Sequence, residues 1–150
     1  MKIKLLDLSR AEMLDSQYDV AFLGLGYEPR CTYISKLLNV KKIADVVILS
    51  FNESSQNRSR IQSYEKLQKK WGSKTTVVNL EHSHTQQVYA ILNKKISEIT
   101  KNEIRIIVDY SSMSRNWYAA ILNYCLKVCS KKLTICLLYT SPSPRDRTRS

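Results

Sequence analysis

The stretch IRIIVDYSSMSRNWYAAIL, residues 104–122, joins a short apolar run to a segment with helical spacing. Residues 104–110 are rich in β-branched side chains and nearly continuous in apolar character, as is typical of a strand buried on both faces of a sheet. Residues 115–129 carry one apolar stripe at helical spacing, made of Trp117, Ile121, Tyr124 and Val128. The stretch therefore predicts a strand that leads directly into a helix.

The same alternation of strand and helix recurs along the chain. Strand-like runs occupy residues 19–26, 44–51, 75–80, 104–110 and 132–135. Segments with helical spacing occupy residues 29–38, 56–71, 85–100 and 115–129. The opening KIKLLDL, residues 2–8, either adds a short strand or leads into the first one. Strands that alternate with helices predict an α/β fold, with a parallel sheet covered on both faces.

Right-handed crossovers leave few ways to order these strands in one sheet. The commonest is the doubly wound order 3-2-1-4-5, in which residues 19–26 form the first strand and lie beside the fourth. We therefore expect a Rossmann-like doubly wound parallel sheet, truncated after the fifth strand. In such sheets ligands bind beyond the carboxyl ends of the strands, where the first and fourth are neighbours.

The end of the chain has a different origin in our interpretation. Residues 136–146, CLLYTSPSPRD, are what one reading frame of a transposase-type sequencing-library adapter encodes. The alternative is a native strand followed by a Ser/Pro/Arg tail. We expect residues 1–135 to be a Rossmann-like domain and the N-terminal fragment of a longer protein. Residues 136–150 would then be a non-native, adapter-derived tail, and the natural protein would continue beyond Ile135.

The composition is that of an ordinary globular domain, with 43% hydrophobic and 25% charged residues among 150. No apolar run approaches the roughly 20 residues that a membrane helix needs, and the polar start is unlike a secretory signal. We therefore predict a cytoplasmic protein that does not associate with membranes, and the sequence does not indicate its oligomeric state. The formal charge is +11, or +9 without residues 136–150. Nucleic acid is a possible partner, but the scattered lysines favour a solvated surface instead.

Two segments are predicted to meet where the first and fourth strands end. The first is GLGYEPRC, residues 24–31, in which Gly24 and Gly26 permit a tight turn and Pro29 begins a helix whose positive end favours an anion. The second is DYSSMSRN, residues 109–116, in which one serine can cap the next helix while the others donate to phosphate oxygens. We predict that a phosphorylated ligand is held by Gly24, Gly26, Arg30, Asn52, Arg58, Ser111, Ser112, Ser114 and Arg115.

The arginines strengthen this prediction. Six precede residue 136, and four of them fall at the same predicted rim, namely Arg30, Arg58, Arg60 and Arg115. The planar guanidinium suits bidentate recognition of phosphate. Asn52 and Glu53 follow the second strand, where ribose hydroxyls are often bound in such sheets.

Catalytic groups are fewer. Asp109 and Glu28 are tentative candidates for a general base or an electrostatic stabiliser, although Asp109 could instead accept backbone amides of the following turn. Ser111 and Ser112 lack the G-x-S-x-G context of a serine nucleophile. His82 and His84 could bind a metal, but histidines without a third ligand are more often loop residues, and we predict no metal site.

Three motifs together resemble an uncharacterised group of bacterial proteins with Rossmann-like domains that is associated with anti-phage defence loci. They are G-[FLY]-E-x-R-[CS] after the first strand, an Asn-rich loop after the second, and D-[IY]-[ST]-S-M-x-R after the fourth. The matching residues are Gly26, Tyr27, Glu28, Arg30, Cys31, Asn52, Asn57, Asp109, Ser111, Ser112, Met113 and Arg115. The resemblance spans residues 19–135 in pattern and implies the fold without implying a reaction.

Three functions follow as hypotheses. The first is a domain that binds a nucleotide or phospho-metabolite, with the cofactor and any reaction undetermined. The second is an S-adenosylmethionine-dependent methyltransferase, because FLGLG, residues 22–26, loosely resembles that family's glycine motif, although Phe22 stands where an acidic residue is usual. The third is a non-enzymatic module that binds nucleic acid or a protein partner through the basic surface.

Overall fold

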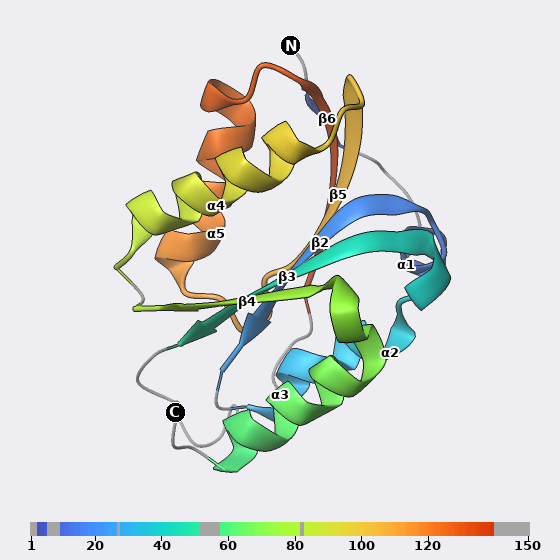
Figure 1. The fold of residues 1–150 in the computed structure, drawn as a ribbon, viewed down its shortest axis with the longest axis vertical. Coiled ribbons are helices and arrows are strands. Elements are labelled where there is room, and N and C mark those ends of the chain that lie inside the picture. Colours follow the sequence, from blue (N-terminus) through green and yellow to red (C-terminus); the bar gives the residue numbers. More distant parts are fainter. Residues whose placement is uncertain (1–2, 6–9, 27, 52–57, 82, 140–150) are drawn as a thin grey trace.

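A six-stranded parallel sheet forms the centre of the protein, with helices on both of its faces (Figure 1). The computed structural model describes residues 3–5, 10–26, 28–51, 58–81 and 83–139. The strands are β1 (Ile3–Leu5), β2 (Tyr18–Leu25), β3 (Ile43–Phe51), β4 (Thr75–Leu80), β5 (Glu103–Asp109) and β6 (Lys132–Leu138). They lie in the order β1-β6-β5-β2-β3-β4.

This order confirms the predicted fold class. Counted from β2 as the first strand, the sheet reads 3-2-1-4-5, the doubly wound Rossmann-like arrangement. The opening residues add β1 as a further parallel strand beside β6. Residues 136–138 extend β6 and pair with the end of β5, and Cys136 and Leu138 are buried. Their apolar side chains are enough to continue the strand, whatever the origin of that segment.

Helices follow the strands in the predicted places. The longer ones are α3 (Arg58–Trp71), α4 (Thr85–Glu98) and α5 (Arg115–Asn123), and the short ones are α1 (Arg10–Leu14) and α2 (Tyr33–Leu37). Among the described residues, η1 (Pro29–Thr32), η2 (Val40–Lys42) and η4 (Gly72–Lys74) are 3₁₀ helices, and η5 (Tyr124–Val128) is a π-helix. Among the described helices, none combines the length and the apolar character needed to cross a membrane.

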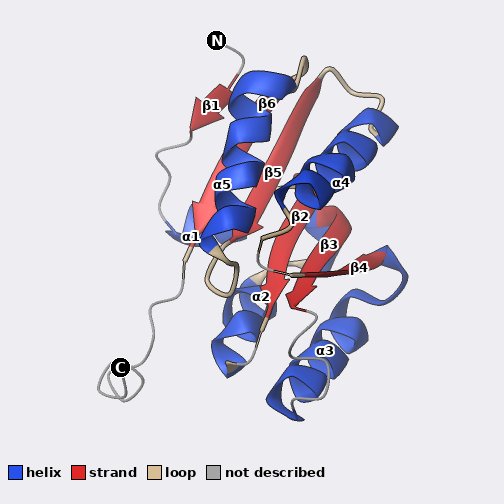
Figure 2. Cartoon of the chain, turned by 90° about the vertical axis from the view of Figure 1, so that its left-hand side faces the viewer, coloured by secondary structure: helices blue, strands red, loops and turns tan. Residues whose placement is uncertain are grey.

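Two hydrophobic clusters lie on opposite faces of the sheet, because successive side chains of a strand alternate between faces. Val20 and Phe22 of β2 pack with α4 and α5, whereas Ala21 and Leu23 pack with α2 and α3. Figure 2 shows these helix pairs around the twisted sheet. Both faces of β2 are therefore dry, which explains its nearly continuous apolar sequence.

Two residues of the predicted helical stripes are exposed instead of buried. Ile61, in the first turns of α3, is 39% exposed, and Val128 is 57% exposed. Val128 leaves the stripe because the chain changes to π-helical geometry after Asn123, with the amide of Cys129 donating to the carbonyl of Tyr124 at 3.0 Å. The extra residue in that turn rotates the following side chains, so Cys125 is buried in place of Val128.

A close backbone contact ties the loop after β5 to β2. An alanine Cβ at position 24 would lie 2.8 Å from both the carbonyl carbon and the carbonyl oxygen of Ser112, and 3.0 Å from Met113 Cγ. Position 26 is different, because the nearest atoms to a Cβ there would be ring carbons of Phe51 at 3.6 and 3.7 Å. Only Gly24 is required by packing, and it fixes how closely the two loops approach.

The pair Gly24→Ala and Gly26→Ala tests this contact. We expect Gly24→Ala to lower the free energy of unfolding by about 1–3 kcal/mol, since backbone atoms must move to admit the methyl group. Gly26→Ala serves as the matched control and should change it by less than about 0.5 kcal/mol. Urea denaturation of both variants measures the difference, and equal losses would show that the contact is not as tight as described.

Candidate functional site

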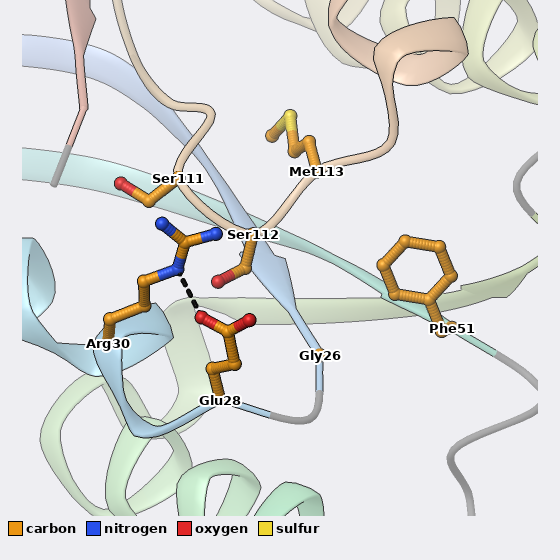
Figure 3. Close-up of a pocket in the computed structure, with 7 residues that line it drawn as sticks. All are labelled: Gly26, Glu28, Arg30, Phe51, Ser111, Ser112 and Met113. Atoms are coloured by element: carbon orange, nitrogen blue, oxygen red, sulfur yellow. Dashed lines mark ion pairs between the residues drawn. The ribbon is translucent and has the colours of Figure 1, made fainter. Parts of the chain in front are cut away.

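A pocket of about 190 Å³ opens where β2 and β5 end side by side (Figure 3). The two strands are parallel neighbours, with Leu23 opposite Asp109, so the loops that follow them must meet at one edge of the sheet. The pocket is lined by Gly26, Glu28, Arg30, Phe51, Ser111, Ser112 and Met113. Its residues come from the loops after β2 and β5 and from the end of β3.

The loop after β2 supplies an ion pair. Glu28 precedes the 3₁₀ turn η1, and its carboxylate Oε2 lies 2.6 Å from Arg30 Nε. The Arg30 side chain is 17% exposed and that of Glu28 is 50% exposed, so the guanidinium is largely withdrawn from water. Arg30 also donates to the hydroxyl of Tyr139 at 3.4 Å, although Tyr139 does not line the pocket.

The loop after β5 is held by its own hydrogen bonds. Buried Asp109 accepts from the backbone amide of Ser111 at 3.1 Å and from its hydroxyl. Ser114 caps α5 by accepting from the amide of Trp117 at 3.1 Å. The Ser112 hydroxyl oxygen is buried and has no hydrogen-bond partner among the described residues. Figure 3 shows it pointing toward the Glu28–Arg30 pair, so it is available to a ligand.

Phe51 forms the other side of the pocket, and a second aromatic ring supports it from behind. Phe51, the last residue of β3, stacks on Trp117 of α5 with ring centroids 4.2 Å apart. Trp117 is fully buried, and its indole N–H donates to the carbonyl of Glu81 at 2.9 Å. The pair fixes the ends of β3 and β4 to α5. Phe51 gives the pocket an apolar wall opposite the Glu28–Arg30 ion pair (Figure 3).

The structure brings together part of the predicted site. Gly26, Glu28, Arg30, Ser111 and Ser112 line one pocket, and Gly24 lies beneath the Ser112 backbone. Phe51 and Met113 line it as well, although the sequence analysis gave neither a binding role. The position of Phe51 at the end of the predicted second strand was the signal that could have identified it.

Other predicted residues do not reach the pocket. Arg58 and Arg115 are exposed first residues of α3 and α5 and are not among its lining. Arg60 is held by Ser50 Oγ at 2.6 Å and Asn79 Oδ1 at 3.2 Å, and Ser114 is occupied as a cap. Asn52, Glu53 and His82 lie outside the described residues. The predicted clustering of arginines therefore reduces to Arg30 in the pocket itself.

The predicted helix over residues 29–38 is also wrong in form. Pro29 begins a four-residue 3₁₀ turn, followed by the five-residue α2. Such short pieces sum few peptide dipoles, so they contribute little positive potential to an anion. The attraction must come from the Arg30 guanidinium and from hydroxyl donors.

The two predicted carboxylates are placed differently relative to the pocket. Asp109 is buried behind Ser111 and does not line the pocket, while Glu28 is paired with Arg30. Burial raises the pKa of the neighbouring Cys31 thiol, and the charge of Asp109 raises it further, against hydrogen bonds from Ser63 and the Gly26 backbone. A raised pKa keeps the thiol in its neutral form at pH 7.

His84 accepts from the Glu81 amide at 3.2 Å, and its Nε2 lies 3.5 Å from the Glu81 carboxylate. Within the described ranges, no three histidine, cysteine, aspartate or glutamate residues gather as metal ligands.

Comparisons with known proteins assign no family. No protein-family model matches the sequence, and no curated protein matches it. The resemblance to the bacterial defence-associated group remains a prediction, so the function has to be argued from the geometry of the pocket.

Proposed function

We propose that this pocket binds the phosphate end of a nucleotide or of another phosphorylated metabolite. The observation that carries the proposal is the meeting of the Arg30 guanidinium and the buried Ser112 hydroxyl in one pocket. The pocket lies at the junction of β2 and β5, where doubly wound sheets bind their ligands.

The donors suit phosphate chemically. A guanidinium offers planar N–H groups that match two phosphate oxygens at once, and a serine hydroxyl can donate to a third. Because Arg30 is only 17% exposed, its interaction with an anion is less weakened by water than that of a surface arginine. Arg30 would supply the charge and Ser112 a directional hydrogen bond.

The pocket is so small that it can enclose only part of a ligand. At about 190 Å³ it is smaller than the roughly 300–1,000 Å³ that encloses a whole drug-sized molecule. It accommodates a phosphate with the adjoining sugar better than a complete dinucleotide. The face of Phe51 offers an apolar surface on which the rest of the ligand can lie.

Glu28 gives the site a competitor for the ligand. Its carboxylate lies 2.6 Å from Arg30 and would repel an incoming phosphate. Without ligand, the ion pair holds the guanidinium at the pocket. On binding, the phosphate would share Arg30 with Glu28 or displace it.

The positive charge of Arg30 favours a phosphate over S-adenosylmethionine as the ligand. S-adenosylmethionine carries a positive sulfonium, for which an arginine in the pocket is a poor partner. Because Glu28 is paired with Arg30 and Asp109 is buried outside the pocket lining, the proposal is limited to binding.

Arg30→Ala should weaken the binding of adenosine monophosphate, ribose 5-phosphate or inorganic phosphate by about 10- to 100-fold. The estimate follows from about 1.5–3 kcal/mol for a hydrogen bond to a charged group, at 1.4 kcal/mol per tenfold. Isothermal titration calorimetry measures the affinities. Arg115→Ala is the matched control, since it removes the same charge from an exposed residue outside the pocket lining, and it should change them by less than twofold. Equal effects of the two variants, or none, would refute the proposal.

Glu28→Gln should act in the opposite direction. Removing the carboxylate frees Arg30 from its competitor while keeping the size of the side chain, so phosphate affinity should rise about 3- to 10-fold, or about 0.7–1.4 kcal/mol. The same calorimetric series measures it. A loss of affinity for ribose 5-phosphate but not for inorganic phosphate would show that Glu28 binds sugar hydroxyls, contrary to a competing role.

A further inference from the structure

A second concave site lies between α2 and α3. These two helices lie on the face of the sheet opposite α4 and α5 (Figure 1). The site is a groove of about 450 Å³ lined by Thr32, Ser35, Lys36, Lys66, Leu67, Lys69 and Lys70. Four of these seven residues are lysines, and none carries a carboxylate. The sequence analysis treated these lysines as scattered, but the fold gathers them around one groove.

One of the four lysines builds the groove. The Lys70 ammonium donates to the carbonyl oxygens of Ser35 and, at 2.7 Å, Leu38, which satisfies the carboxyl end of α2. Burial lowers the pKa of Lys70. The neighbouring Trp71 donates its indole N–H to Ser35 Oγ at 2.8 Å. These bonds join α3 to α2 and give the groove a fixed floor.

The other three lysines carry charge without a carboxylate partner. Lys36, Lys66 and Lys69 are exposed, and no ion pair joins any of them to a described acidic residue. Some lysines elsewhere on the surface are paired with carboxylates, in the pairs Lys42–Asp15, Lys95–Asp45, Lys101–Asp19 and Lys132–Glu103. Others, such as Lys94 and Lys127, are exposed without an ion pair to a described acidic residue, but they do not line a shared groove with the first three. Like charges gathered in a concave, weakly polar site raise its potential and attract anions.

We propose that this groove binds single-stranded nucleic acid through its phosphodiester backbone. Compact ammonium groups on flexible stems suit repeated phosphates, which need charge more than a fixed geometry. Tyr33 is 46% exposed, and the Lys36 ammonium lies 5.5 Å from the centre of the Tyr33 ring. An exposed ring next to a basic groove is the combination on which single-stranded bases stack.

A peptide fits the same groove less well. An extended peptide gains its affinity by pairing with the edge of a sheet, which helical walls do not offer. An amphipathic helix needs apolar pockets for its anchors, yet Leu67 is the only aliphatic lining residue and is itself 1% exposed. The Ser35 hydroxyl and carbonyl already accept hydrogen bonds. The groove thus combines the ammonium groups with a mainly apolar lining that includes the aliphatic stems of the lysines.

The site is separate from the phosphate pocket and does not depend on it. The turn η1 contributes Arg30 to the pocket and Thr32 to the groove, so the two sites share an element but no lining residue. Lys66→Gln/Lys69→Gln should therefore leave the affinity of the pocket for inorganic phosphate unchanged within about twofold. This separates failure of one proposal from failure of the other.

The inference can be tested by fluorescence anisotropy. Labelled 15-mers of deoxythymidine and of uridine are titrated with the whole chain at several salt concentrations. Lys66→Gln/Lys69→Gln should weaken binding at least tenfold at low salt. It should also reduce the slope of log affinity against log salt by about 1.4, at about 0.7 per phosphate contact of a single strand. Both oligomers should bind within about threefold of one another, because they share the backbone.

Two matched controls remove the effect of net charge. Lys94→Gln/Lys127→Gln makes the same charge change at exposed lysines of α4 and η5, and should change affinity by less than twofold. Replacing Arg145, Arg147 and Arg149 with glutamine tests the basic end of the chain in the same way, and circular dichroism confirms that each variant is folded.

Equal losses in both lysine pairs, or loss on replacing the three arginines, would overturn the inference. The inference would also be overturned if the wild-type chain bound neither oligomer, or if it preferred one of them by more than tenfold. A third contrary result would be that polyglutamate displaces the oligomers at a lower concentration than unlabelled oligomer does. That last outcome would assign the groove to an acidic polypeptide.

Discussion

The close packing of Gly24 against the Ser112 backbone is the contact on which the candidate site depends. It exists because β2 and β5 are adjacent and parallel, so the chain leaves both strands at the same edge of the sheet. A side chain at position 24 would hold the loop after β5 away from the loop after β2. The Ser112 hydroxyl and the Arg30 guanidinium then could not line one small pocket. The absence of a side chain at Gly24 thus links the strand order to the chemistry of the site.

Much of the fold could be predicted because buried parallel strands leave a strong pattern. The runs that became β2, β3 and β5 are largely apolar on both faces, and right-handed crossovers leave few orders for the strands. The π-helical turn could not be predicted in the same way. Apolar spacing around Tyr124 fits an α-helix equally well, and the change that exposes Val128 depends on how α5 ends over the sheet.

The candidate site was predicted by position more accurately than by side-chain direction. Glycines and serines act through the backbone path, which strand order fixes, so Gly24, Gly26 and Ser112 lie where expected. Arginines have long side chains, and the first residue of a helix can point toward the pocket or into solvent. Arg58 and Arg115 point into solvent, whereas Arg30 is held at the pocket by its ion pair with Glu28. Sequence spacing does not encode that difference.

The central claim is that the loops carrying Arg30 and Ser112 form one anion site. Two-dimensional ¹H–¹⁵N NMR during titration with adenosine monophosphate tests it most directly. We expect the amides of Gly26 and Ser112 and the Arg30 side-chain Nε–H to shift together and to saturate with a single dissociation constant, while the amides of α4 stay in place. Shifts confined to one of the two loops, or seen only around Lys66 and Lys69, would contradict it.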